Sequence, residues 1–188
     1  MKERTQHKLK PSILQFCRSI VTDQEPFYVP VQPLSDQPVD ECFVIVPKHI
    51  STHGGKQVIG WYIEEWPKVM IEATFHAIWQ TEDGLFVDIT PKEGISRILF
   101  LPDTHRKYEG RQIDNIRKPL TEDKIIYRFC ELAHDLFTLE NKGDLAYESE
   151  ITITSAMEEK KREMYSLYLM LVRKYGVKMF GKTYGTAF

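Results

Sequence analysis

A cysteine, a histidine and an aspartate in the first half of the chain are of the types that carry out thiol chemistry on acyl groups. They are Cys42, His76 and Asp88. A thiol near its ordinary pKa is mostly protonated at neutral pH, and a nearby imidazole raises its thiolate fraction. A carboxylate can fix the tautomer of that imidazole and stabilise its charged form. The sequence therefore raises the question of whether the chain brings these three side chains together.

Residues 69–90 predict the two strands that would position the histidine and the aspartate. Apolar and polar residues alternate along residues 69–80, which is the two-residue period of a strand, and His76 lies on that segment. The same alternation resumes over residues 85–90, which hold Asp88. A histidine and a carboxylate on neighbouring strands of a packed hairpin are a common way to orient an imidazole.

The length of the turn decides whether the two side chains can meet. A two-residue loop of Asp83 and Gly84 would place His76 and Asp88 on opposite faces of the hairpin. A three-residue loop, residues 82–84 with Gly84 left-handed, pairs Ile78 with Asp88 instead. His76 and Asp88 then share a face as diagonal neighbours, about 7–8 Å apart at the backbone. The functional interpretation therefore requires the odd-length loop.

The hairpin resembles the transglutaminase-like branch of the papain-like cysteine enzymes. In that family the histidine sits in an H-A-x-W pattern on one strand, and the aspartate follows a turn glycine in a D-x-T-P-like context. This chain has HAIW at residues 76–79, a glycine at position 84, and DITP at residues 88–91. The match covers less than a tenth of the chain. The family also places its cysteine before the histidine, at a helix start, and Cys42 fits that order.

The resemblance implies a Cys-His-Asp triad on a papain/transglutaminase-like α+β fold. Cys42 would be the nucleophile, His76 its base and Asp88 the residue that orients the imidazole. Papain-like enzymes also bind the oxyanion with a side-chain amide a few residues before the cysteine, and Gln37 has about that spacing. Trp79 is a candidate wall of the substrate cleft, with a core position as its alternative. Such chemistry needs no cofactor and no metal, and a peptide or protein-like substrate would suit it.

Each of these residues could instead have a purely structural role. Cys42 could be an ordinary buried cysteine, and His76 a core histidine bonded to a backbone carbonyl. Residues 40–53 are ambiguous because Pro47 fits poorly inside a helix, so we expect a single turn holding Cys42 and then a second short helix from Pro47. His49 and His53 stand four residues apart, but no carboxylate accompanies them in a metal-binding pattern, and a solvated helix face is expected.

The remaining elements complete an α+β prediction for one domain over residues 1–188. Helical spacing predicts helices over residues 12–21, 121–138 and 156–175, the last opened by a capping box at Ser155. Further strands are expected over residues 57–66 and 95–101. The expected architecture is a mostly antiparallel sheet packed against N-terminal and C-terminal helices. Residues 103–120 are polar and basic and predict a long, mobile or functional loop, and the tail after residue 176 predicts a flexible segment.

Composition limits the classes of function. The chain has 188 residues, of which 42% are hydrophobic and 12% aromatic, with a net charge of −2. This is typical of a globular protein and argues against one built to hold nucleic acid. No apolar run is long enough to span a bilayer, so no membrane partner is expected, and the N-terminus lacks a secretory signal. Three cysteines without CxxC spacing favour free thiols and a cytoplasmic location.

Three hypotheses of function follow. The first is a thiol-dependent acyl hydrolase or acyltransferase that acts on an amide or ester. The second is a papain-like scaffold without turnover that serves as a binding or regulatory module. The third is a nucleic-acid-associated protein that uses the basic residues of segment 103–120.

Overall fold

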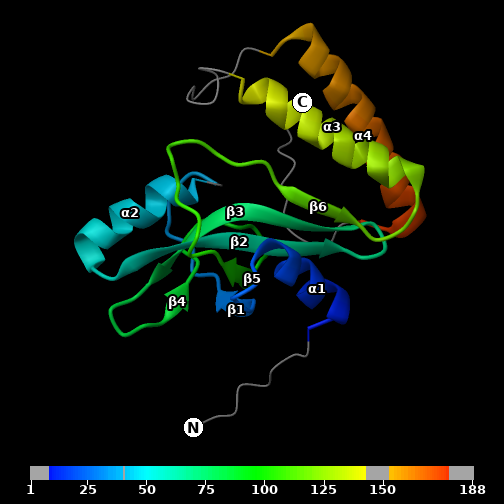
Figure 1. Cartoon of the computed structure of the whole chain (residues 1–188). Coiled ribbons are helices and arrows are strands. Elements are labelled where there is room, and N and C mark those ends of the chain that lie inside the picture. The colour runs from blue at the N-terminus through cyan, green and yellow to red at the C-terminus, as the bar shows by residue number, and fades with distance from the viewer. Residues whose placement is uncertain (1–8, 40, 143–152, 178–188) are drawn as a thin grey trace.

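In the part of the chain that the structure describes, a six-stranded antiparallel sheet forms the centre and four helices pack against it (Figure 1). The computed structural model describes residues 9–39, 41–142 and 153–177. The α+β class with an antiparallel sheet is confirmed. The strand order is β1-β5-β2-β3-β4, and β6 pairs with the same edge of β3 as β4 does. The strands are β1 (Phe27–Pro30), β2 (Lys56–Trp66), β3 (Met70–Gln80), β4 (Phe86–Val87), β5 (Arg97–Pro102) and β6 (Ile116–Pro119).

The long hairpin of β2 and β3 is the backbone of the sheet. Its strands pair over their full length, and Gly60 of β2 lies directly opposite His76 of β3. Gly60 also pairs with Pro102 of β5 on its other side. A Cβ at Gly60 would lie 2.2 Å from the backbone oxygen of Leu101. A side chain at position 60 would therefore clash with β5, and glycine is needed there for β5 to pair with β2 beside His76.

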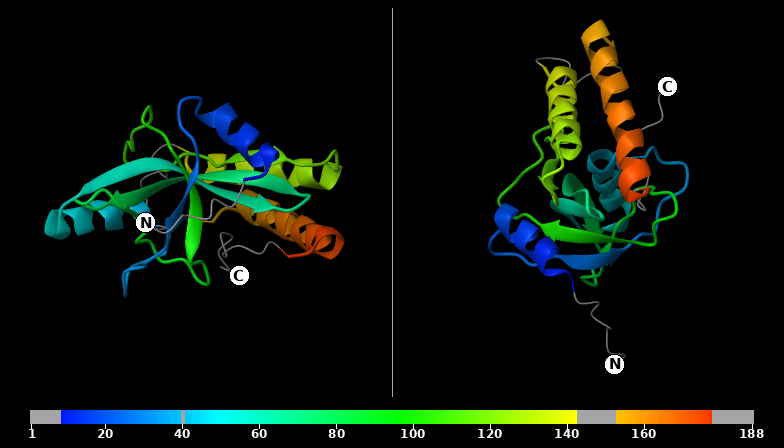
Figure 2. Two further views of the ribbon diagram at one scale, coloured as in Figure 1. Left: turned by 90° about the horizontal axis from the view of Figure 1, so that it is seen from below. Right: turned by 90° about the vertical axis from the view of Figure 1, so that its right-hand side faces the viewer.

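One face of the sheet is covered by the first helix, α1 (Pro11–Ile20). Figure 2 shows α1 lying across the strands. The alternation of the strands sends Trp61 and Phe75 toward this face, where they pack with Phe16 and Cys17 of the helix. The predicted helix and its buried cysteine are therefore confirmed, since Cys17 is fully buried.

The last two helices pack at the turn end of the β2–β3 hairpin, far from α2 (Figures 1 and 2). They are α3 (Lys124–Glu140) and α4 (Ser155–Tyr175). Trp66 and Met70 flank the turn and pack against both helices, and the indole nitrogen of Trp66 donates to the carbonyl oxygen of Gly176. The predicted cap at Ser155 is wrong by one position. Thr154 is the cap, and its hydroxyl accepts from the backbone N–H of Met157.

Residues 42–53 form one continuous helix, α2 (Cys42–His53), and not the predicted turn followed by a second helix at Pro47. Pro47 lacks the N–H that would bond to the carbonyl of Phe43, which costs about 3 kcal/mol in a helix interior. Packing outweighs that cost, since Ile45 and Val46 are buried against Val87 and Ile89. The helix also begins with the backbone N–H of Ile45 bonded to the carbonyl oxygen of Glu41.

The polar segment 103–120 is expected from its sequence to be a loop throughout, yet its last residues form β6. Ile116 to Pro119 pair with β3 because Arg117 bonds to Glu72 there and half-buried apolar side chains flank it. Of the tail predicted after residue 176, only Val177 lies within the described residues. None of the helices in the described ranges has the length and apolar character needed to cross a bilayer.

Candidate functional site

The turn between β3 and β4 has the odd length that the site requires. The backbone N–H of Thr81 bonds to the carbonyl of Leu85, so three residues, 82–84, form the loop. Gly84 has a φ of 82°, in the left-handed region that glycine enters without strain. Trp79 pairs with Val87 and Gln80 with Phe86, the register that places Ile78 opposite Asp88 when it is continued by one step. The prediction of a three-residue loop is confirmed.

His76 and Asp88 meet in the interior on the same face of the sheet. Nε2 of His76 lies 3.0 Å from Oδ2 of Asp88. The two side chains are 6% and 0% exposed. An ionised carboxylate only accepts hydrogen bonds, so Nε2 carries the proton and Nδ1 is left to face a thiol. The arrangement is that of an imidazole oriented by a carboxylate, as the sequence predicted.

The end of β1 fixes the position of Asp88. The backbone N–H of Asp88 donates to the carbonyl oxygen of Pro30, and the N–H of Gln32 donates to the carbonyl oxygen of Asp88. Oδ1 of the carboxylate accepts from the backbone N–H of Thr90, the third residue of the DITP motif. The aspartate is therefore held on both its backbone and its side chain, and its carboxylate has little freedom to turn away from His76.

Lys92 is a member of this cluster that the sequence analysis missed. Its Nζ lies 3.2 Å from Oδ2 of Asp88, the oxygen that His76 also contacts, and its side chain is 9% exposed. The ammonium group also lies 5.6 Å from the ring centroid of Tyr62, a cation–π contact. A lysine four residues after the aspartate, directly behind the DITP motif, was the signal available in the sequence.

The charges of the cluster shift both pKa values strongly. Burial and the Lys92 ammonium lower the pKa of His76, but the Asp88 carboxylate and Cys42 outweigh them, and the pKa rises to about 9. Burial raises the pKa of the Asp88 carboxyl, yet His76, Lys92 and the Thr90 N–H together hold it well below its usual range. At neutral pH the cluster therefore contains an imidazolium, a carboxylate and an ammonium.

Cys42 is the first residue of α2, and its sulfur lies within electrostatic reach of His76. β4 pairs with β3 at residues 79–80, and β6 pairs with it at residues 70–73. The part of β3 between these two regions, which includes His76, therefore pairs, within the described ranges, with β2 only and has no strand on its other side. The helix α2 packs against β3. The start of a helix favours a negative charge on the sulfur. Among the described residues no hydrogen bond joins Cys42 to His76, and Cys42 is 2% exposed.

A tyrosine from segment 103–120 covers the start of α2. The ring of Tyr108 stacks on that of Phe43, with centroids 4.0 Å apart and planes 4° apart, and Phe43 stacks in turn on Phe75. Burial, Glu41 and Cys42 raise the pKa of the Tyr108 hydroxyl, which places this side chain close to the thiol. Tyr108 thus stacks on the residue that follows Cys42, where it is placed to restrict access to the thiol.

Removing that ring is expected to expose the thiol. We predict that Tyr108→Ala raises the rate at which iodoacetamide alkylates Cys42 severalfold, because the reagent no longer waits for the stacked ring to move. The rate is measured by peptide mass spectrometry after timed quenching. Tyr127→Ala, which removes another exposed tyrosine from α3, is the control and should leave the rate unchanged. An unchanged rate in Tyr108→Ala would show that another element limits access.

Two further predicted site residues are not brought to the cluster. Trp79 is half-buried among the side chains of α2, and its indole nitrogen donates to the carbonyl oxygen of Gly54. It is an odd-numbered residue of β3 and lies on the face opposite to His76, so it holds α2 to the sheet. Gln37 is half-buried in the loop before α2, and no hydrogen bond joins its amide to the described residues.

The other two cysteines lack an activating environment. Burial, followed by the charge of Glu25, raises the pKa of Cys17 to about 12. Burial also raises the pKa of Cys130 to about 11, and its sulfur contacts that of Met70. Neither thiol has a histidine partner in the described residues. Cys42 therefore differs from both in having His76 within electrostatic reach.

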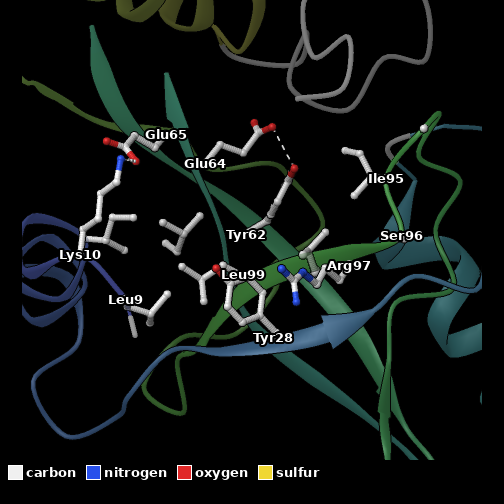
Figure 3. Close-up of a pocket in the computed structure, with 14 residues that line it drawn as sticks. Leu9, Lys10, Tyr28, Tyr62, Glu64, Glu65, Ile95, Ser96, Arg97 and Leu99 are labelled. Carbon is white, nitrogen blue, oxygen red and sulfur yellow. Dashed lines mark hydrogen bonds and ion pairs between the residues drawn. The ribbon is translucent and has the colours of Figure 1, made fainter. Parts of the chain in front are cut away.

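A hollow of about 440 Å³ is bordered by Tyr62 and Glu64 of β2 and Arg97 of β5, and Figure 3 shows its lining. It opens where β2 and β5 diverge, beyond the last pair that they form, Ile63 with Leu99. Several of its polar groups already have partners, and Arg97 lies over the ring of Tyr28. The hydroxyl of Tyr62 donates to Glu64, and Lys10 bonds to Glu65. The remaining lining is mixed and gives no ligand chemistry.

In the part of the chain that the structure describes, no metal site competes with the cluster. Within the described ranges no group of three or more histidine, cysteine, aspartate or glutamate side chains could hold a metal ion. His49 and His53 stack on each other on α2. In segment 103–120, Arg106 pairs with Asp103 and Arg117 pairs with both Glu72 and Asp114, so these cations are engaged within the fold.

Comparisons with protein-family models, with curated proteins and with solved structures each find no match for this chain.

Proposed function

We propose that this protein is a thiol-dependent acyl hydrolase or acyltransferase that acts on an amide or ester through Cys42, His76 and Asp88, on a papain/transglutaminase-like scaffold. The observation that carries the proposal is the buried contact of 3.0 Å between Nε2 of His76 and Oδ2 of Asp88, beside a cysteine at a helix start. Because Nε2 bonds to Asp88, Nδ1 of His76 is the ring nitrogen that remains for the thiol, and a cysteine–histidine pair needs such a nitrogen.

The chemistry follows from the roles of the three groups. The thiolate of Cys42 attacks the carbonyl carbon of the substrate, and a carbon–sulfur bond forms. His76 gives its proton to the departing amine or alcohol as the carbon–nitrogen or carbon–oxygen bond breaks. Water or a second amine then attacks the thioester and gives its proton to His76, and the carbon–sulfur bond breaks, which releases the acyl product and restores the Cys42 thiolate. Asp88 holds the imidazole in place and stabilises its charged form throughout.

Selective alkylation tests the proposal. At limiting iodoacetamide and neutral pH, Cys42 is expected to be labelled before Cys17 and Cys130, because the pKa values of those two thiols are raised to about 12 and about 11. Peptide mass spectrometry of the intact, folded chain measures the order. Labelling that does not favour Cys42, even in Tyr108→Ala, would remove the enzymatic proposal.

A binding module without turnover is the second candidate, and the closure of the site favours it. Cys42 and His76 are both buried, and no hydrogen bond joins them. The two candidate functions differ in whether Cys42 forms a covalent acyl-enzyme. A chloromethyl ketone or activated ester should attach covalently to Cys42 if the protein turns over substrate. A binding module would leave the cysteine unmodified by the ester at concentrations where iodoacetamide still reacts.

A further inference from the structure

Lys92 is a buried cation at the candidate site, and the chemistry outlined above gives it no task. Its ammonium and the imidazole of His76 share one oxygen of Asp88, at 3.2 Å and 3.0 Å respectively. A lysine is almost never buried unless it is paired. An exposed alternative for this side chain would avoid the cost of removing the charge from water. Its position beside His76 is therefore a feature to be explained.

The sum of the charges suggests what Lys92 does. With His76 protonated and Asp88 ionised, these two groups are neutral together and need no third partner. Lys92 adds one positive charge, so the cluster of three carries a net charge of +1. The Asp88 carboxylate therefore faces two cations at one oxygen, and its charge is shared between them. The imidazolium is then less fully compensated than it would be beside Asp88 alone, which favours a negative charge on a neighbouring thiol.

We propose that Lys92 is a positioning residue that takes up the charge of Asp88 and so makes the Cys42 thiolate the ionic partner of the His76 imidazolium. This inference rests on the proposed function. The contact is direct and short, and the lysine side chain is fixed at its far end by the ring of Tyr62. Lys92 acts through Asp88 and does not touch the reacting atoms.

The other titratable groups around the cluster leave this role to Lys92. Burial, followed by the charge of Glu64, raises the pKa of Tyr62 far above its usual range, so this residue stays neutral. Glu72 is paired with Arg117. Electrostatic interactions connect Tyr62 with Glu64, Glu72 and Asp88, His76 with Cys42, and Tyr108 with Glu41 and Cys42.

Titration of His76 by NMR in the full-length chain tests the proposal. Removing a nearby cation makes protonation easier, so Lys92→Met should raise the pKa of His76 by about 1. Lys92→Arg keeps the charge and should leave the pKa near its wild-type value. In parallel, alkylation of Cys42 at pH 7 should slow in Lys92→Met, because a cation that favours the thiolate is lost, and should recover in Lys92→Arg.

The controls separate charge from packing. Lys56→Met removes an exposed lysine from the start of β2 and should change neither measurement. If circular dichroism shows that Lys92→Met does not fold, Lys92→Gln replaces it, since the amide can still bond to Asp88 without the charge. An unchanged His76 pKa in the folded neutral variant overturns the proposal, and so does an equal loss of labelling in Lys92→Arg. The titration of His76 does not depend on the reactivity of Cys42, so its result holds even where unselective labelling removes the proposed function.

Discussion

Replacing His76 with alanine is expected to slow the alkylation of Cys42 about thirtyfold or more at pH 7. A thiol with an ordinary pKa of about 8.5 is only about 3% ionised at that pH, whereas a thiol paired with an imidazolium is mostly thiolate. Burial adds to the loss, since burial is the largest cause of the raised pKa values of Cys17 and Cys130. The rate constant is obtained from timed labelling with iodoacetamide and peptide mass spectrometry.

The control for this prediction is a histidine elsewhere on the same helix as the thiol. His49→Ala removes a side chain from the far end of α2, where it stacks on His53, and should leave the labelling rate of Cys42 unchanged. Asp88→Asn should slow the labelling less than His76→Ala does, because the imidazole remains but its orientation is weakened. Selective labelling that survives His76→Ala would mean that the start of α2 alone activates the thiol.

Replacing Asp88 with alanine is expected to destabilise the fold by about 3–5 kcal/mol at pH 5.5. The side chain is fully buried, and its removal leaves His76 and Lys92 as uncompensated cations in the interior. It also leaves the backbone N–H of Thr90 without its acceptor. Urea unfolding followed by circular dichroism measures the loss.

The pKa values of His76 and Asp88 determine the direction in which the stability of the fold changes with pH. The pKa of His76 is about 9 in the folded protein and 6.5 in an unfolded chain, so protonated His76 stabilises the fold fully below pH 6.5. That stability is lost as the pH rises through 9, and it amounts to about 3 kcal/mol. The Asp88 carboxylate contributes its part above pH 3.8, and that part is lost as the pH falls below this value. The wild type should therefore be more stable at pH 6 than at pH 9.5.

In Asp88→Ala the pH dependence of stability that His76 causes should reverse. Burial and Lys92 then lower the pKa of His76, and no carboxylate opposes them. Asp23→Ala is the matched control. Asp23 and His105 form a similar pair at 3.2 Å, but their side chains are 50% and 70% exposed. An exposed pair of this kind contributes about 0–1 kcal/mol. An equally small loss in Asp88→Ala would mean that the buried cluster has another compensating group.

The hairpin and its turn were predictable from sequence because they depend on neighbours along the chain. Alternation of side chains sets the faces of β3, and the glycine at position 84 marks the turn. The same alternation places Trp79 opposite to His76, so the sequence already held the reason why this residue stays out of the cluster. The HAIW motif therefore serves both faces of the strand, with its histidine on one and its tryptophan on the other.

The parts that sequence reasoning missed depend on contacts between distant segments. Pro47 lies inside α2 because burial of Ile45 and Val46 outweighs a local preference. Tyr108 meets Phe43 from a segment far along the chain, and no local pattern marks such a pair. Lys92 could be found only once Asp88 was known to be buried, since an exposed lysine is the ordinary outcome.

The chain's three tryptophans are distributed so that each reports on a different part of the molecule. Trp61 packs beneath α1, Trp66 beneath α3 and α4, and Trp79 against α2. Variants that keep a single tryptophan would therefore give a fluorescence signal specific to one packing layer. The Trp79 signal would follow the helix that carries Cys42, whereas the Trp66 signal would follow the opposite end of the β2–β3 hairpin. The order in which the three signals change during unfolding would show whether the candidate site opens before the rest of the fold.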